Sequence, residues 1–222
     1  MEITADLLLK AYTIGVFPMA ESHDSLDLHW IDPENRGILP LDKIHISRSL
    51  RKTLRKAPFE IRCNTSFQEV LEKCSATTSQ RPDTWINPLI KRIYTQLFER
   101  GFAHTVECWL DGRMVGGLYG VSLGGAFFGE SMFSRRSDAS KVALIHLAAR
   151  LKKGNYSLLD TQFTTQHLSQ FGTIEVEREI YKQCLFEAMQ VPARFPLELT
   201  QKELEDFIDS NIGNSPAVYS DD

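Results

Sequence analysis

The sequence contains no long apolar run and no basic leader. No stretch of its 222 residues approaches the roughly 18 consecutive apolar residues of a membrane-spanning helix. Residues 1–15 include Glu2 and Asp6 and lack the positively charged start of a secretory signal. These absences argue against a membrane or exported protein and predict a cytoplasmic one.

Cysteine is scarce and unclustered. The four thiols, Cys63, Cys74, Cys108 and Cys184, form no Cys-x-x-Cys pair, which predicts free thiols in a reducing compartment. The six histidines also lack the spacing of a metal site. We therefore expect neither a metal nor a cofactor. Internal repeats are absent too, and the length fits one large domain or two small ones.

Acidic residues are in slight excess, but the charge is unevenly placed. The chain carries 25 Lys and Arg against 29 Asp and Glu, which gives a net charge of −4. Residues 201–222 hold six carboxylates and a single lysine, whereas residues 43–62 hold seven basic side chains and one glutamate. The overall acidity therefore hides a basic segment, which favours an anionic partner.

The glycine-rich stretch 115–133 predicts a hairpin that turns at residues 122–125. Glycine inside a strand often marks a bulge or a close backbone approach. The space left by the missing side chains is bordered by Phe127, Met132 and Phe133, so we expect an apolar pocket there. Glu130 lies inside this apolar run and must be paired, hydrogen-bonded or shifted in pKa if it is buried.

A helix over residues 138–153 follows, and a short buried strand over 156–159 comes after it. The helix presents Leu144 and Leu147 on one face. The strand delivers Asp160 and Gln162 at its carboxyl end, where α/β sheets often carry their sites. Strand alternation places these two side chains on the same face.

Structural interpretations of the same polar residues remain open. Asp160 and Gln162 would equally serve as a helix cap or in loop hydrogen bonds, as most polar residues after strands do. Glu130 would either satisfy backbone amides, bind a cationic substrate, or orient Asp160.

We predict a mixed fold, α+β or α/β, in three parts. Residues 1–57 form a small N-terminal domain that ends in a basic helix. Residues 58–196 form a larger domain with a mixed, mostly antiparallel sheet flanked by helices, and residues 197–222 form an acidic tail. Within the first part, residues 32–37 contain proline and glycine and are typical of a turn. A terminal helix is expected over 200–208.

The basic helix after Ser47 has two interpretations. A run of charges is usually a solvated helix face. The spacing here places several cations on one side, and such a stripe would neutralise a phosphate backbone. Arg135 lies beside the expected pocket, where it would meet a terminal nucleotide. The predicted RNA contacts are Arg48, Arg51, Lys52, Arg55, Lys56 and Arg135.

Several motifs, in order across residues 7 to 189, resemble the bacterial leucyl/phenylalanyl-tRNA–protein transferase family. Because the first of them lies close to residue 1, we expect a first domain without the amino-terminal extension common in the family. The motifs are GVFP (15–18), HWIDP (29–33), HISRSLRK (45–52), TWI (84–86), GESMFSR (129–135), SDASKxAL (137–144) and DxQ (160–162).

This resemblance implies an enzyme that moves leucine or phenylalanine from aminoacyl-tRNA to proteins beginning with Arg or Lys, thereby marking them for N-degron degradation. Methionine is a further candidate donor, and a monomer is expected. The resemblance also implies a fold like that of GCN5-related acetyltransferases, with Asp160 and Gln162 as catalytic residues. The expected substrate-binding residues are Trp30, Trp85, Phe127, Glu130, Met132, Phe133, Ser134, Leu144 and Leu147.

Two other functions compete with this one. A CoA-dependent N-acetyltransferase would hold pyrophosphate in a glycine-bearing loop before the central helix, but residues 135–141 contain no glycine and add a carboxylate. A non-enzymatic RNA-binding module would explain the basic helix, although it leaves the pocket beside Asp160 and Gln162 without a purpose.

Overall fold

A computed structural model describes residues 3–23, 25, 27–77, 84–214 and 216. The acidic tail predicted over residues 197–222 falls partly outside these ranges. The elements are α1 (Ala5–Thr13), β1 (Phe17–Ala20), β2 (Leu28–Ile31), β3 (Asn35–Ile38), α2 (Arg48–Lys56), β4 (Glu60–Cys63), α3 (Phe67–Ser75), α4 (Pro88–Glu99), β5 (Ala103–Leu110), β6 (Arg113–Leu123), β7 (Ala126–Ser134), α5 (Ala139–Lys153), β8 (Leu158–Gln162), α6 (Gln166–Ser169), β9 (Ile174–Glu177), α7 (Arg178–Met189) and α8 (Gln201–Ser210).

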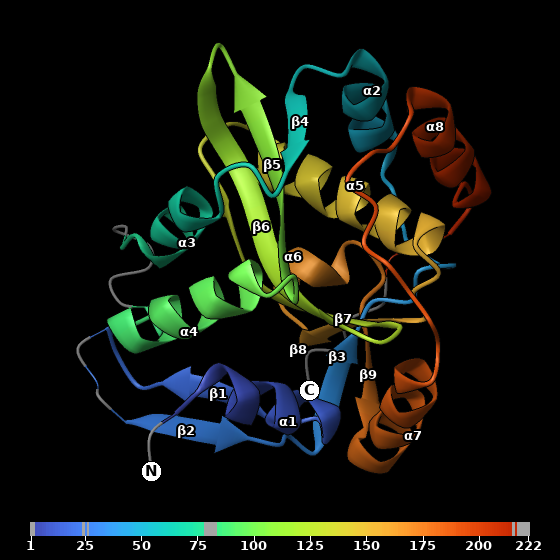
Figure 1. The fold of residues 1–222 in the computed structure, drawn as a ribbon. Helices are drawn as coiled ribbons and strands as arrows, with labels where there is room; N and C mark the ends of the chain where they lie inside the picture. Colours follow the sequence, from blue (N-terminus) through green and yellow to red (C-terminus); the bar gives the residue numbers. More distant parts are fainter. Residues whose placement is uncertain (1–2, 24, 26, 78–83, 215, 217–222) are drawn as a thin grey trace.

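The strands form two sheets. A two-stranded sheet pairs β1 with β2, and a seven-stranded sheet has the order β4-β5-β6-β7-β8-β3-β9 (Figure 1). Every neighbouring pair is antiparallel except β7 and β8, which run parallel and are connected through α5. The expected mixed, mostly antiparallel sheet flanked by helices is confirmed. The likeness to GCN5-related acetyltransferases stays a prediction.

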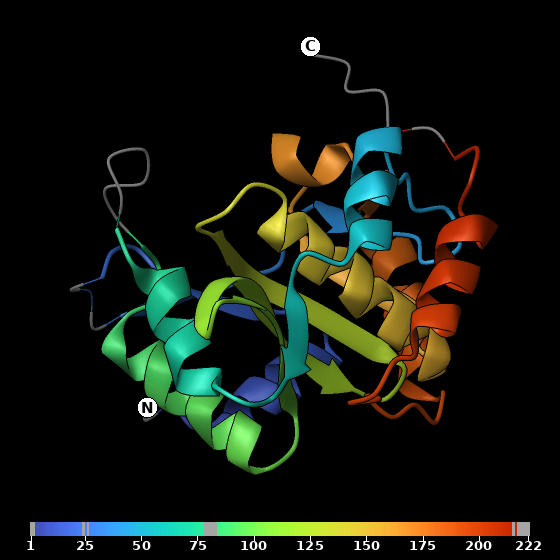
Figure 2. The same ribbon diagram turned by 90° about the horizontal axis from the view of Figure 1, so that it is seen from above.

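Helices cover both faces of the large sheet. Helices α2, α5 and α8 lie over one face, and α3 and α4 lie over the other (Figures 1 and 2). Strand alternation divides the core accordingly. Leu118 and Phe127 pack in the cluster beneath α5, whereas their neighbours Tyr119 and Phe128 pack in the cluster that contains α4 and α1.

The structure confirms several local predictions. The hairpin turns at Gly124 and Gly125, as expected, and Gly124 adopts the positive φ of 55° that favours glycine. The terminal helix is present as α8, and Leu204, Phe207 and Ile208 are buried. The segment 197–222 therefore contributes side chains to the core.

The N-terminal region contains strands that the sequence patterns did not indicate. Residues 35–38, expected to lie largely within a turn, form β3, which inserts between β8 and β9 of the large sheet. Part of the segment 1–57 therefore belongs to the main sheet, and the domain boundary near residue 57 stays a prediction. Among the described helices, none is both long and apolar enough to cross a membrane.

Candidate active site

A cavity opens where the parallel strands β7 and β8 stop pairing. Their last paired residues are Phe128 and Asp160. Beyond this point the strands separate around a cavity of about 390 Å³. Its lining comprises Phe17, Pro18, Met19, Trp85, Leu118, Tyr119, Gly129, Glu130, Ser131, Met132, Leu144, Leu147, Leu159, Thr161, Gln162, Phe163, Thr165, His167 and Leu168.

Glu130 is the extra residue of a β-bulge. Tyr119 pairs with Ser131 and Gly120 pairs with Gly129, so Glu130 has no partner on β6. Bulges beside sites re-aim a side chain, and this one brings the carboxylate to two hydroxyls. The Tyr12 hydroxyl donates to Glu130 Oε1 at 2.6 Å, and the Tyr94 hydroxyl donates to Oε2 at 2.9 Å. Desolvation raises the pKa of Glu130 to about 7, against the two hydrogen bonds, which lower it.

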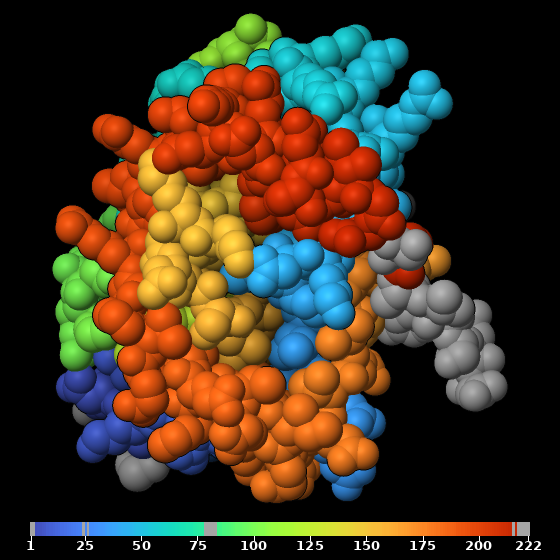
Figure 3. Space-filling model, turned by 90° about the vertical axis from the view of Figure 1, so that its right-hand side faces the viewer, coloured from blue at the N-terminus to red at the C-terminus, as the bar shows by residue number. Residues whose placement is uncertain are grey.

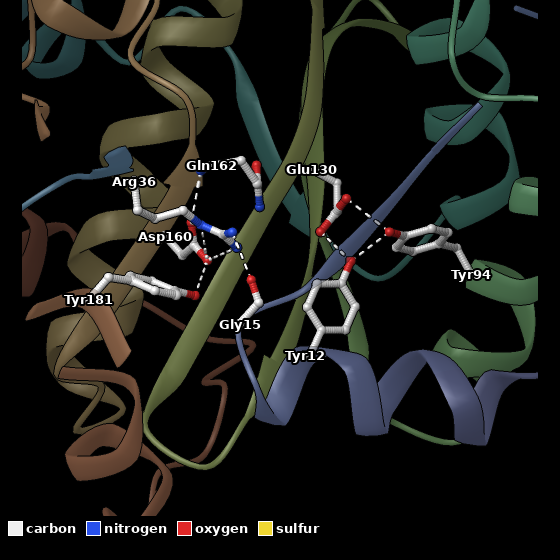
Figure 4. Close-up of polar contacts among 8 residues, drawn as sticks. All are labelled: Tyr12, Gly15, Arg36, Tyr94, Glu130, Asp160, Gln162 and Tyr181. Carbon is white, nitrogen blue, oxygen red and sulfur yellow. Dashed lines mark hydrogen bonds and ion pairs between the residues drawn. The ribbon is translucent and has the colours of Figure 1, made fainter. Parts of the chain in front are cut away.

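Asp160 is fully buried and does not line the cavity; Figure 4 shows it between Arg36 and Tyr181. Arg36 donates from Nη2 to Oδ2 at 2.7 Å and from Nε to Oδ1 at 3.0 Å. The Tyr181 hydroxyl donates to Oδ2 at 2.6 Å, and the backbone N–H of Gln162 donates to Oδ1 at 2.8 Å. Burial alone would lower the pKa of Arg36, but Asp160 outweighs this effect and raises it.

Gln162 lies at the centre of a tight three-residue turn. Its φ is 58°, and the N–H of Phe163 donates to the carbonyl of Thr161 at 2.7 Å. A γ-turn with positive φ is rare and strained. This conformation takes Gln162 out of the strand alternation, so the expected shared face is wrong: Gln162 lines the cavity and Asp160 does not. The buried Gln162 Nε2 has no partner among the described residues.

The structure brings some of the predicted substrate-binding residues together and separates others. Trp85, Glu130, Met132, Leu144 and Leu147 line the cavity. Those that do not are Trp30, Phe127, Phe133 and Ser134.

Each of the excluded side chains has another environment. Phe127 is fully buried and packs against the rings of Tyr156 and Phe195. Phe133 is buried in the core cluster on the α3 and α4 side, and Trp30 packs partly against the same cluster from β2. The Ser134 hydroxyl is exposed and donates to the carbonyl of Arg136 at 2.8 Å.

Four residues around the polar groups were not found from the sequence. Arg36 lies in the segment that resembled a turn, and its partner Asp160 is 124 residues away. Tyr12, Tyr94 and Tyr181 belong to the apolar faces of their helices, where a tyrosine ordinarily packs as core. Nothing in their local spacing indicates that their hydroxyls meet carboxylates.

The basic side chains of α2 surround a shallow surface hollow at a distance from the cavity. It is lined by Arg48, Arg51, Lys52, Arg55 and Lys56. Helix α8 lies beside α2 (Figure 3), and Asp209 pairs with Arg55 at 3.3 Å. Arg135 is exposed and borders a separate hollow next to α3. Within the described residues, no group of His, Cys, Asp or Glu side chains is arranged to hold a metal ion.

Two family models match the chain. Residues 38–186 match the leucyl/phenylalanyl-tRNA protein transferase, and residues 1–34 match the N-terminal domain of the same transferase. The chain belongs to this family. The prediction of an aminoacyltransferase of the leucyl/phenylalanyl-tRNA–protein transferase family is thereby confirmed.

Proteins named leucyl/phenylalanyl-tRNA–protein transferase are similar over most of their length. The protein from Paramagnetospirillum magneticum is 57% identical over 198 residues, which cover 89% of this chain and 95% of that protein. The protein from Rhodospirillum rubrum is 53% identical over 199 residues, covering 90% and 93%. That from Rhizorhabdus wittichii is 58% identical over 191 residues, covering 86% and 77%.

Proposed function

We propose that this chain transfers leucine or phenylalanine, and also methionine, from aminoacyl-tRNA to the α-amino group of proteins that begin with Arg or Lys. The observation that carries the proposal is the largely apolar cavity between β7 and β8, which is lined by Gln162, a residue whose buried Nε2 has no partner within the described part of the chain. The proposed setting is the N-degron route of protein degradation in the cytoplasm, with the enzyme acting as a monomer.

The cavity suits the aminoacyl end of the donor. At about 390 Å³ it lies at the small end of ligand pockets, which span about 300–1,000 Å³. Leu144, Leu147 and Met132 offer an apolar wall to an aliphatic side chain without a branch at Cβ, or to an aromatic one. Phe163, 43% exposed, and Trp85 offer aromatic surface on which a terminal base would stack. The body of the tRNA must lie outside, where α2 carries its cations.

The reaction needs alignment more than activation, because the aminoacyl ester is already reactive. The neutral α-amine of the acceptor attacks the ester carbonyl carbon. A C–N bond forms, the C–O bond to the ribose breaks, and the proton of the amine passes to the ribose oxygen that leaves. An α-amine has a pKa of about 7.7–8.0, so an appreciable neutral fraction exists near pH 7. Gln162 Nε2 would donate to the carbonyl oxygen as charge develops on it.

Asp160 acts in this proposal through Gln162. Its oxygens already accept hydrogen bonds from Arg36, Tyr181 and the backbone of Gln162, and it does not border the cavity. Asp160 therefore orients Gln162 and does not take a proton directly from the acceptor amine. Among the described lining residues, Glu130 is the only carboxylate, and it would attract the cationic acceptor when ionised.

Two alternatives are less well supported. The N-terminus of α5 carries Asp138, whose carboxylate accepts from Thr53 and pairs with Lys141. This negative charge opposes a CoA pyrophosphate at the position where an acetyltransferase would bind it. A binding module without catalysis accounts for α2, but it does not account for the strained turn that presents Gln162 to the cavity.

The deciding experiment offers the purified protein leucyl-, phenylalanyl-, methionyl- and alanyl-tRNA with peptides that begin with Arg, Lys or Ala. We expect transfer from the first three donors to the Arg and Lys peptides, measured as a mass increase of one residue at the peptide amine. Acetyl-CoA is the comparison donor. Acetylation in its presence, or equal use of alanyl- and leucyl-tRNA, would refute the proposed function.

A further inference from the structure

The strained turn at Gln162 is held by a buried polar cluster of Arg36, Asp160 and Tyr181, none of which lines the cavity. Asp160 Oδ1 accepts the backbone N–H of Gln162 at 2.8 Å, while Arg36 and Tyr181 bind the same carboxylate at 2.7 and 2.6 Å. We propose that Arg36 and Tyr181 are positioning residues of the transfer reaction. They act through Asp160 to fix the backbone N–H of Gln162, and thereby the position of its side-chain amide. The inference rests on the proposed role of Gln162.

The turn needs such support because its conformation is unfavourable for a residue with a side chain. A positive φ of 58° at a non-glycine residue persists only where the surroundings hold it. Gly37, opposite Gln162 in the β3–β8 register, is part of the same support. A Cβ at residue 37 would lie 2.6 Å from the carbonyl carbon of Phe163, so the backbone that follows Gln162 fits only against glycine.

Burial makes the cluster rigid. Arg36, Asp160 and Tyr181 are exposed by 1%, 0% and 1%, so water cannot replace any of their hydrogen bonds. The guanidinium also lies 4.5 Å from the centres of the Phe17 and Tyr181 rings. Its planar fork reaches both carboxylate oxygens at once, a geometry that a lysine cannot reproduce. The position of the Asp160 carboxylate, and hence of the Gln162 N–H, is therefore set by Arg36.

The same cluster connects the N-terminal helix to the cavity. Arg36 Nη1 donates to the carbonyl of Gly15, just after α1, at 2.8 Å. Tyr12, on the last turns of α1, reaches Glu130, which lines the cavity from β7 (Figure 4). The end of α1 thus contacts both sets of polar groups, and Arg36 provides the link on the Gln162 side.

The test compares Tyr181→Phe and Arg36→Lys with the wild-type chain. Tyr181→Phe removes one hydrogen bond and keeps the ring; Arg36→Lys keeps the charge and removes the fork. We expect each to lower kcat for leucyl transfer roughly tenfold or more, with KM for leucyl-tRNA changed by less than about twofold. We also expect the backbone amide proton of Gln162 to exchange with solvent faster. The backbone N–H of Leu39, which donates to the carbonyl of Leu159 at 2.9 Å, should exchange at the wild-type rate.

Two matched variants separate positioning from a general loss of stability. Tyr156→Phe removes another inward-facing tyrosine hydrogen bond, the 2.6 Å contact with Ser122. Lys182→Gln, next to Tyr181, breaks the 3.1 Å pair with Asp32 without touching Asp160. Both should retain the wild-type kcat.

The outcomes are distinguishable. Wild-type kcat in both Tyr181→Phe and Arg36→Lys, or a decrease that only follows the unfolded fraction measured by thermal unfolding, would overturn the inference. Wild-type kcat in Arg36→Lys alone would overturn the role given to the guanidinium fork of Arg36. If the wild-type chain transfers nothing, the proposed function fails, and unchanged exchange of the Gln162 amide would then overturn the positioning role separately.

Discussion

The Tyr12 hydroxyl on α1 and the Glu130 carboxylate on β7, 118 residues apart in sequence, are joined by a hydrogen bond of 2.6 Å. The Tyr94 hydroxyl lies 2.6 Å from that of Tyr12 and 2.9 Å from Glu130. Three oxygen–oxygen contacts therefore close a ring. With Glu130 protonated, three hydrogens are available for three contacts; with Glu130 ionised, only two are. Burial favours the protonated carboxyl and raises its pKa to about 7, although the two hydrogen bonds donated by the tyrosines favour the ionised form.

The first prediction follows from this pKa. The folded chain holds a proton on Glu130 that the unfolded chain releases near the ordinary value of 4.5. The folded state therefore binds more protons between pH 4.5 and 7, and the free energy of unfolding should fall as pH rises through this window. The decrease attributable to Glu130 is at most about 3 kcal/mol, because each pKa unit corresponds to about 1.36 kcal/mol.

Glu130→Gln should remove this contribution. Urea unfolding of both proteins between pH 4.5 and 8 measures it as the difference between the two curves, in which the other carboxylates cancel. We expect the stability of the wild type relative to the variant to decline up to about pH 7 and then to level off. A difference that stays constant with pH would show that Glu130 is ionised throughout the range.

The second prediction concerns the volume of the cavity. Gly129 borders it, and a Cβ at this position would meet only the Asp160 carbonyl oxygen, at 3.5 Å. Gly129→Ala should therefore fit, whereas Gly129→Phe should fill the space and abolish donor binding. The measurement is competition by an analogue that joins a leucine or phenylalanine side chain to adenosine. An apolar pocket discriminates by about 1–3 kcal/mol per methylene, so an alanine analogue should compete poorly. Undiminished binding of the analogue to Gly129→Phe would place the donor elsewhere.

The features predicted from the sequence are those encoded locally. The hairpin of β6 and β7 follows from the turn signal at residues 122–125 between two apolar, glycine-rich segments, and the terminal helix from the pattern after Thr200. The apolar wall of the cavity was found through Leu144 and Leu147, which recur at helical spacing. In each case the residues that determine the element lie within one or two turns of chain.

The features that were missed depend on partners remote in sequence. Residues 35–38 have turn-like neighbours, and they form a strand because β8 and β9 supply hydrogen bonds on both sides. Alternation placed Gln162 beside Asp160, but Gln162 has a positive φ, and its N–H donates to an Asp160 carboxylate that the remote Arg36 holds in place. The sequence around Arg36 did not indicate its role, because its ion pair with Asp160 forms only in the folded chain.

The third prediction concerns the cations of α2. Reversing Arg51 and Lys52 to Glu should weaken binding of any tRNA, charged or uncharged, because phosphate contacts carry little sequence information. The slope of log affinity against log salt should become shallower by about 0.7–0.9 for each phosphate that the protein no longer neutralises. Asp209→Asn is the matched opposite, since it frees Arg55 from its ion pair and should strengthen binding slightly. An unchanged salt slope in the charge-reversed variant would show that the cations of α2 are solvated and do not contact tRNA.

The last prediction separates the roles of Gln162 and Asp160. Gln162→Ala removes a cavity-lining side chain whose Nε2 we propose as the donor, and removal of one such donor typically lowers the rate by about 10²–10³-fold. Asp160→Asn should also slow transfer, but it leaves the buried Arg36 charge uncompensated and should cost about 3–5 kcal/mol of stability. Both variants should bind tRNA as the wild type does, because α2 is untouched.

Gln183→Ala, which makes the same change on the exposed face of α7, is the control. Single-turnover transfer from bound leucyl-tRNA, together with urea unfolding, distinguishes the two effects. Full activity in both variants under these conditions would remove the pair from the mechanism, whereas a slow but stable Gln162→Ala beside a slow and unstable Asp160→Asn would establish one as the donor and the other as its support.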